Sequence, residues 1–144
     1  MSPLPVPTNY QRRPLGGDPI HQELTRLPTG FLIRDYFPAD ANGDRIVWQG
    51  LLVAEVNGGI PESLMTATQP YYVPYSPAAA YGQGSDTAVG IMRERHDETI
   101  TDWQIAPVNF GIAYTQRCYV AGGVLGDIPA AAVTNLAGIQ WRTG

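Results

Sequence analysis

Short apolar runs separated by turn-forming residues dominate the chain from residue 31 onwards. Between residues 103 and 114 the pattern alternates with period two, and we expect Val108, Phe110 and Ile112 to share one face of a strand. Such spacing is typical of a mainly β domain, a small β-barrel or β-sandwich. The expected strands cover residues 31–37, 46–56, 71–75, 87–92, 103–114 and 117–121.

Glycine and proline mark where these strands turn or stop. The pair Asn42-Gly43 predicts a tight turn, and Gly50 predicts a bulge or bend inside the apolar run at 46–56. Pro74 has no N–H to donate, so we expect the strand at residues 71–75 to lie at an edge of the sheet.

One short helix is expected near the C-terminus. Ile128, Ala132 and Leu136 recur every four residues and form one apolar stripe. Asp127 is a suitable N-cap, with a proline two residues later in the first turn. Gly138 is placed to end the helix in a left-handed conformation. The expected fold is therefore mainly β (α+β), with one short C-terminal helix.

Residues 1–30 form a separate region, which we interpret as an extended arm. They include six prolines, each of which fixes its φ angle and removes a backbone donor, and we see no strand or helix period among them. Their net charge is +1, whereas the rest of the chain carries −5. The alternative is a disordered tail. The β-rich domain is then expected to span residues 31–144.

Composition excludes several classes of chemistry. The chain has no lysine, so it has no Schiff-base lysine and no P-loop lysine. A net charge of −4 argues against generic nucleic-acid binding. Cys118 stands alone in an apolar run, so we expect a small buried core residue. No apolar stretch is long enough to predict a membrane span or a secretory signal.

Candidate catalytic and metal-binding motifs are weak. His96 lies among charged residues without metal-ligand spacing, and we interpret it as part of a solvated loop. Residues 40–44 differ from a calcium loop in the place of the glycine and in the residue at the twelfth position. Residues 82–86 match neither the Gly-x-Ser-x-Gly nor the Gly-x-Gly-x-x-Gly pattern. We therefore expect no catalytic set, no metal and no cofactor.

Aromatic residues are concentrated in the middle of the chain. Tyr71, Tyr72, Tyr75 and Tyr81 lie close together in sequence, with Trp48, Trp103 and Trp141 elsewhere. They could form a sugar-binding face or a protein interface. The alternative is a small β core with tyrosines at its rim.

Three short phrases follow one another along the chain. They are Leu52-Val53-Ala54-Glu55-Val56 with the following Gly-Gly, Tyr72-Val73-Pro74-Tyr75-Ser76-Pro77-Ala78-Ala79, and Thr87-Ala88-Val89-Gly90-Ile91-Met92. In this order they resemble the head decoration protein family of tailed bacteriophages. An alternating β run and an Ala-rich C-terminal segment follow, so the resemblance covers roughly residues 47–142. The chain departs from the family where Ser76 replaces a common Asp, and the connector at residues 93–102 is richer in arginine than the family leads us to expect. The motif does not fix the arm at residues 1–30.

The resemblance implies a homotrimer on the outer surface of the expanded capsid, at threefold positions. There it would bind the major capsid protein and stabilise the head against internal DNA pressure, with no direct contact to nucleic acid or membrane. The arm would order on the capsid, and part of it would pair as a strand with a capsid segment.

Two groups of residues are candidates for these contacts. The expected capsid-binding residues of the arm are Asn9, Tyr10, Arg12, Arg13 and His21. The expected residues of the trimer interface or rim are Trp48, Tyr72 and Tyr75. The main alternative function is a carbohydrate- or receptor-binding β module of a phage particle. A trimeric β-fold enzyme, such as a nucleotide hydrolase, is a third and weaker alternative, because its motifs are not found.

Overall fold

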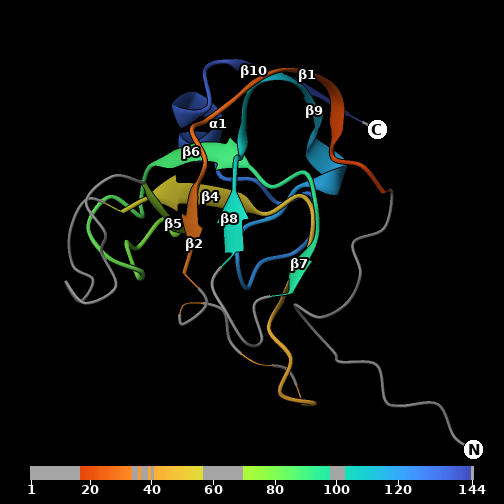
Figure 1. The fold of residues 1–144 in the computed structure, drawn as a ribbon. Helices are drawn as coiled ribbons and strands as arrows, with labels where there is room; N and C mark the ends of the chain where they lie inside the picture. Colours follow the sequence, from red (N-terminus) through yellow and green to blue (C-terminus); the bar gives the residue numbers. More distant parts are fainter. Residues whose placement is uncertain are drawn as a thin grey trace, which may run out of the picture.

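The chain folds around one curled β-sheet, as a computed structural model shows (Figure 1). The structure describes residues 17–33, 36, 39, 41–56, 70–97 and 103–143. Within these residues the large sheet comprises β1 (Ile20–Arg26), β2 (Gly30–Leu32), β4 (Leu52–Glu55), β5 (Tyr71–Pro74), β6 (Ala88–Ile91), β8 (Trp103–Ile105), β9 (Val108–Tyr114) and β10 (Ile139–Arg142). The mainly β fold class is thereby confirmed.

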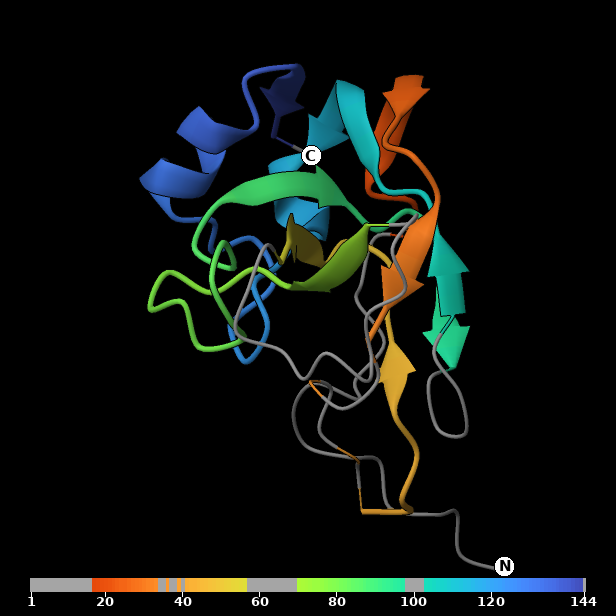
Figure 2. The ribbon, with the colours of Figure 1, turned by 60° about the vertical axis from the view of Figure 1, so that its left-hand side comes forward.

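The strands of the large sheet follow the order β1-β9-β6-β4-β5-β2-β8, and β10 also pairs with β9. The pairs β2–β5 and β9–β10 are parallel, and the other pairs are antiparallel. Strands β4 and β6 run across the direction of β2 and β8, so the sheet is strongly curled (Figures 1 and 2). A second, two-stranded sheet pairs β3 (Ile46–Val47) with β7 (His96–Asp97).

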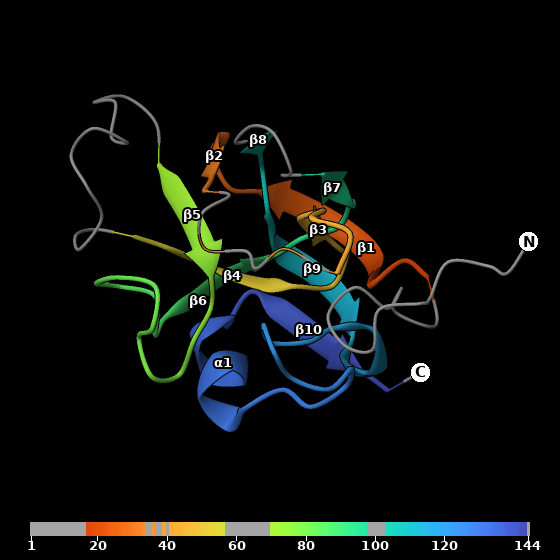
Figure 3. The same ribbon diagram turned by 90° about the horizontal axis from the view of Figure 1, so that it is seen from below.

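The only helix of more than one turn in the described residues is α1 (Ala130–Asn135), which lies beside β6 and β10 (Figure 3). The side chain of Asn135 accepts a hydrogen bond of 3.1 Å from the backbone N–H of Ala88 in β6. The helix begins later than the sequence predicts. Its N-cap is Pro129 rather than Asp127, and no side chain caps it.

Gly138 also has a different role from the expected one. It does not adopt a positive φ angle, and the helix ends at Leu136 in a conformation that is not left-handed. A Cβ at Gly138 would lie 2.6 Å from the ring of Phe110. The glycine is therefore needed for close packing between the end of the helix and β9.

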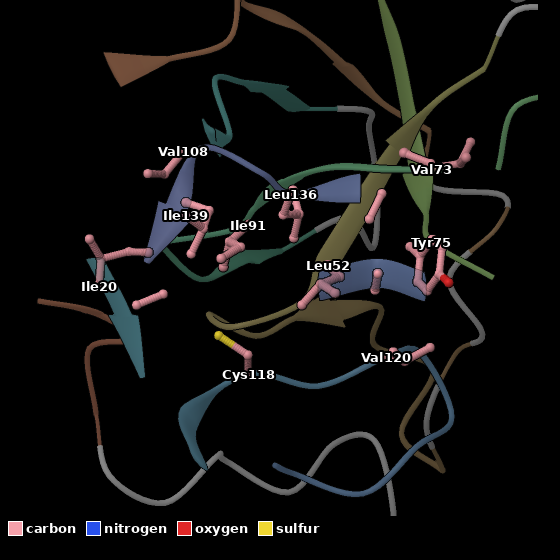
Figure 4. Packing of buried hydrophobic residues seen from close by; sticks show 14 of the residues in the cluster. Ile20, Leu52, Val73, Tyr75, Ile91, Val108, Cys118, Val120, Leu136 and Ile139 are labelled. Atoms are coloured by element: carbon pink, nitrogen blue, oxygen red, sulfur yellow. The ribbon is translucent and has the colours of Figure 1, made fainter. Parts of the chain in front are cut away.

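Both faces of the central strands are covered, which explains their continuous apolar sequence. Leu52 and Ala54 of β4 point into one hydrophobic cluster, while Val53 between them points into another. In β5, Tyr71 and Val73 belong likewise to the first cluster, and Tyr72 between them belongs to the second. The first cluster gathers side chains from both ends of the described chain (Figure 4).

Several expectations about the strands need correction. The first concerns Pro74, which we expected to mark an edge strand. β5 instead lies inside the sheet, between β4 and β2. The proline is tolerated because β2 pairs only with Tyr71 and Tyr72, so the position of Pro74 lies beyond the end of β2 and no donor is needed there.

The second correction concerns the faces of β9. Phe110 was expected to share a face with Val108, yet Val108 is fully buried and Phe110 is 49% exposed. Gly111 and Ala113 are buried instead. The pairing of β1 with β9 shifts register near this point, and a Cβ on Gly111 would collide with the carbonyl oxygen of Gln22. The irregular pairing changes which residues face the core.

The third correction concerns residues 117–121, which were expected to form a strand. The segment starts in a 3₁₀ turn, η3 (Thr115–Arg117), and then makes a single parallel bridge between Tyr119 and Leu51.

Gly50 forms the predicted bend, with a φ of 95°. Its N–H donates to the carbonyl of Met92, and its own carbonyl accepts from the N–H of Tyr119.

Candidate functional site

Part of the region assigned to the arm belongs to the sheet. We expected no strand before residue 31, but β1 occupies Ile20–Arg26 and pairs with β9. Ile20 is 3% exposed and lies in the main cluster. The expectation was wrong because strand formation here depends on β9, a partner nearly 90 residues away in the sequence, and β1 has little apolar alternation of its own. The role of the preceding residues on a capsid stays a prediction.

The predicted capsid-binding residues fall into two groups. Asn9, Tyr10, Arg12 and Arg13 lie outside the described residues. His21 lies on β1, with an exposed side chain. Its Nδ1 is 2.6 Å from the phenol oxygen of Tyr114, and the two rings meet edge to face. His21 is thus fixed on the surface of the domain, and its contact with a capsid stays a prediction.

Two of the predicted interface residues lie in the core of the single chain. Tyr72 is fully buried and Tyr75 is 1% exposed, so neither side chain is at a rim or available to a second subunit. The reason is the central place of β5, which is covered on both faces. Burial raises the pKa of Tyr72 to about 12, with the charge of Glu55 as a smaller cause.

Trp48 is the predicted interface residue that remains near the surface. The tryptophan is half-buried, and the guanidinium of Arg95 lies over its indole ring, 5.2 Å from the ring centre. The indole Nε1 is buried and has no hydrogen-bond partner among the described residues. The backbone carbonyl of Trp48 accepts a hydrogen bond of 3.1 Å from the phenol of Tyr119. Trp48 therefore stays a candidate interface residue, whereas Tyr72 and Tyr75 do not.

Within the part of the chain that the structure describes, the other aromatic residues do not form one exposed platform. Tyr71 is 5% exposed and stacks against Phe31. Tyr36 and Tyr81 are half-buried and meet edge to face, with their ring centres 5.7 Å apart. The side chain of Trp103 lies outside the described set.

The expectation that Cys118 is a small buried core residue is confirmed. The residue is fully buried in the main cluster, where its sulfur lies among apolar side chains (Figure 4). Burial raises the pKa of the thiol to about 12, so the reactive thiolate is strongly disfavoured at neutral pH.

His96, expected in a solvated loop, is instead half-buried in β7, where burial lowers its pKa.

Charged residues form a cluster that the sequence analysis missed. Arg26 contacts both Glu23 and Glu94, and Arg93 contacts both Asp18 and Glu23. Hydrogen bonds from Arg26 lower the pKa of Glu23 to about 2, partly offset by burial and reinforced by Arg93. Residues three apart point to opposite faces of a regular strand, so the local sequence does not reveal the pairing of Glu23 with Arg26 or the contacts with residues about 70 positions later.

Neither a family model, nor a curated protein, nor a solved structure matches this chain. Within the described residues, no group of three or more His, Cys, Asp or Glu side chains is arranged to hold a metal ion. The same residues contain no helix with the length and apolar character needed to cross a membrane.

Proposed function

We propose that the protein is a capsid decoration protein of a tailed bacteriophage. It binds as a homotrimer to the outer surface of the expanded head, at threefold positions, where it stabilises contacts between copies of the major capsid protein. Its role is structural rather than enzymatic, and its place is the virion. The protein that it contacts is the major capsid protein, without direct contact to nucleic acid or membrane.

The observation that carries this proposal is the place of the three family-like phrases in the fold. The phrases form β4, β5 and β6, which are separated in sequence but are neighbours in the order β6-β4-β5. Fifteen residues lie between β4 and β5, and thirteen lie between β5 and β6. The resemblance therefore describes one continuous structural unit at the centre of the sheet.

The departure at Ser76 also has a structural explanation. Ser76 is 9% exposed, and its Oγ accepts a hydrogen bond of 3.3 Å from the N–H of Ala80. Its backbone carbonyl accepts another from the N–H of Ala79, so residues 76–80 form a tight turn after β5. The hydroxyl of Ser76 thus helps to close the turn that follows β5, so the serine has a local structural role at this position.

The alternative of a sugar- or receptor-binding module loses its main support. That reading relied on a platform of tyrosines, since sugars stack on exposed aromatic faces. Tyr71, Tyr72 and Tyr75 are all at most 5% exposed. A structural role on a particle does not require such a platform.

Cosedimentation with capsid shells tests the proposal. Shells are assembled from the major capsid protein of the same genome, and half of them are expanded before the full-length chain is added. We expect the chain to sediment with expanded shells, in three copies per threefold position, and to remain in the supernatant with unexpanded shells. Cryo-electron microscopy then locates the added density. Failure to sediment with expanded shells at about micromolar protein would overturn the proposal, because cement contacts need about that affinity or better.

A further inference from the structure

Strand β1 is poorly held by apolar contacts. Of its seven residues, Ile20 alone is buried, and Leu24 is 65% exposed. The pairing of β1 with β9 is interrupted by three register shifts. Such irregularities leave residues outside the regular ladder of hydrogen bonds. An edge strand with one buried side chain and an interrupted ladder needs another source of stability.

Two arginines supply that stability, and the contacts of Arg26 with its two carboxylates are bidentate. Arg26 donates to both carboxylate oxygens of Glu23, at 2.8 Å each, and to both oxygens of Glu94, at 2.6 and 3.2 Å. Arg93 donates to Glu23 at 2.9 Å and to Asp18 at 2.8 Å. Pairs with this fork geometry are stronger than single contacts, and a network exceeds an isolated surface pair.

These contacts join the start of the domain to segments far along the chain. Arg93 and Glu94 follow β6, whereas their partners lie in or just before β1. Arg26 also donates to the carbonyl of Ala106, just before β9, at 3.3 Å. The guanidinium of Arg117 donates to the backbone carbonyl of Asp18 at 3.0 Å. The charged groups thus hold both ends of β1 against the rest of the sheet.

The network is accessible to salt. Side-chain exposure ranges from 26% at Glu23 to 52% at Glu94, so dissolved ions reach every pair. Added salt shortens the range of interaction between exposed charges. The apolar clusters beneath β4 and β5 do not depend on charge and are not weakened in this way. Strand β1 is therefore stabilised mainly by ion pairs, whereas β4 and β5 are stabilised mainly by apolar packing.

We propose that Asp18, Glu23, Arg26, Arg93 and Glu94 form a salt-sensitive latch for strand β1. When the latch is screened, residues 18–26 open as a local unit while the central strands stay closed. Local opening of this kind is the way in which proteins lose their least stable elements first. The latch is a property of the folded domain, and it does not depend on the proposed role on a capsid.

Hydrogen–deuterium exchange of the full-length chain tests this inference. Exchange is measured on peptides covering β1 and on peptides covering β4 and β5, in about 20 mM and about 500 mM NaCl, between which the screening length shortens severalfold. We expect exchange in β1 to rise about tenfold at high salt, in proportion to its local opening, with little change in β4 and β5. Equal acceleration of all the peptides, or none in β1, would overturn the proposal.

Variants separate the latch from a general effect of salt. Glu23→Gln should give fast exchange in β1 already at low salt and should lose most of the response to NaCl. Arg93→Gln should act in the same direction, and the double variant should exchange more slowly than the product of the two single effects predicts, because both residues act in one network. The matched control is Arg142→Gln, an exposed arginine outside the network, which should behave as wild type. An unchanged salt response in both single variants would contradict the latch.

Discussion

The phenol of Tyr72 donates a hydrogen bond of 2.6 Å to the backbone carbonyl of Pro28. Tyr72 lies fully buried in β5, and Pro28 lies in the link between β1 and β2. Gly30, two residues further on, packs so closely that a Cβ there would lie 2.7 Å from the Tyr72 ring. The link is therefore tied to the centre of the sheet, and the folded domain includes residues before position 31.

Removal of the Tyr72 hydroxyl tests this tie. Tyr72→Phe should lower the free energy of unfolding by about 1 kcal/mol, because the Pro28 carbonyl loses its donor. Urea denaturation followed by circular dichroism measures the change. Tyr81→Phe is the control, since this half-buried tyrosine makes no phenol hydrogen bond within the described residues, and it should leave the midpoint unchanged. Equal midpoints for the Tyr72 variant and wild type would show that the tie contributes nothing.

Acid should weaken the domain through Glu23. Its folded pKa is about 2, below the value of 4.5 for the free side chain. The unfolded state therefore binds a proton first, so the stabilisation is present above about pH 4.5 and is lost as the pH falls toward about 2. Glu23→Gln lacks this group, and we expect its melting temperature to fall less steeply than that of wild type over this interval. Parallel melting curves for the two proteins would contradict the assigned pairing.

A side chain at Gly50 should be poorly tolerated. Its φ of 95° is unfavourable for other residues, and a Cβ would collide with the carbonyl oxygen of Arg117. Gly122→Ala is the matched control, because Gly122 has a φ of 75° with open space around it. We expect the control to cost about 1 kcal/mol from backbone strain and Gly50→Ala to cost at least about 2–3 kcal/mol. Chemical denaturation of both variants measures the difference between their free energies of unfolding. Equal values for the two variants would contradict the close contact between Gly50 and the Arg117 carbonyl.

The thiol of Cys118 should be inert in the folded protein. With a pKa raised to about 12 by burial, it should not react with a disulfide reagent at neutral pH, and it should react fully in denaturant. Cys118→Ala should cost about 1–3 kcal/mol through lost packing and should leave any capsid binding intact. Fast reaction of the native thiol would show that the first cluster is open to solvent at this point.

Two deletions should separate the arm from the domain. Because β1 begins at Ile20, removing residues 2–16 should leave the melting temperature nearly unchanged and weaken capsid binding. Removing residues 2–27 takes away β1 and should lower the free energy of unfolding by at least about 2 kcal/mol, the cost of losing one buried isoleucine. The sequence alone favoured a stable domain after the longer deletion, and thermal melts of the two proteins decide the point. A longer deletion as stable as the shorter one would mean that β1 adds nothing to the fold.

Much of the fold follows from local sequence. The apolar runs around Leu52 and Ile91 predict strands because little else buries so many side chains in so few residues. The bend at Gly50 and the turn at Gly43 follow from backbone angles that glycine adopts most easily, and both have positive φ angles. The burial of Cys118 follows from its apolar neighbours. These features depend on interactions within a few residues.

Other features were decided by tertiary contacts. Pro74 lies inside the sheet because its neighbour β2 ends before reaching it, and Tyr72 is buried because two clusters cover both faces of β5. Neither the length of a neighbouring strand nor the number of covered faces is written in the residues of β5 itself.

The charged cluster shows the same division most clearly. By itself, the sequence determined that residues 18–26 contain both acidic and basic side chains, and that Arg93 and Glu94 lie in a charged segment. Only the tertiary structure brought the two segments together, because β1 pairs with β9 and thereby lies beside the residues that follow β6. Ion pairs between distant segments depend on the route of the chain in space, and a local pattern carries no information about that route.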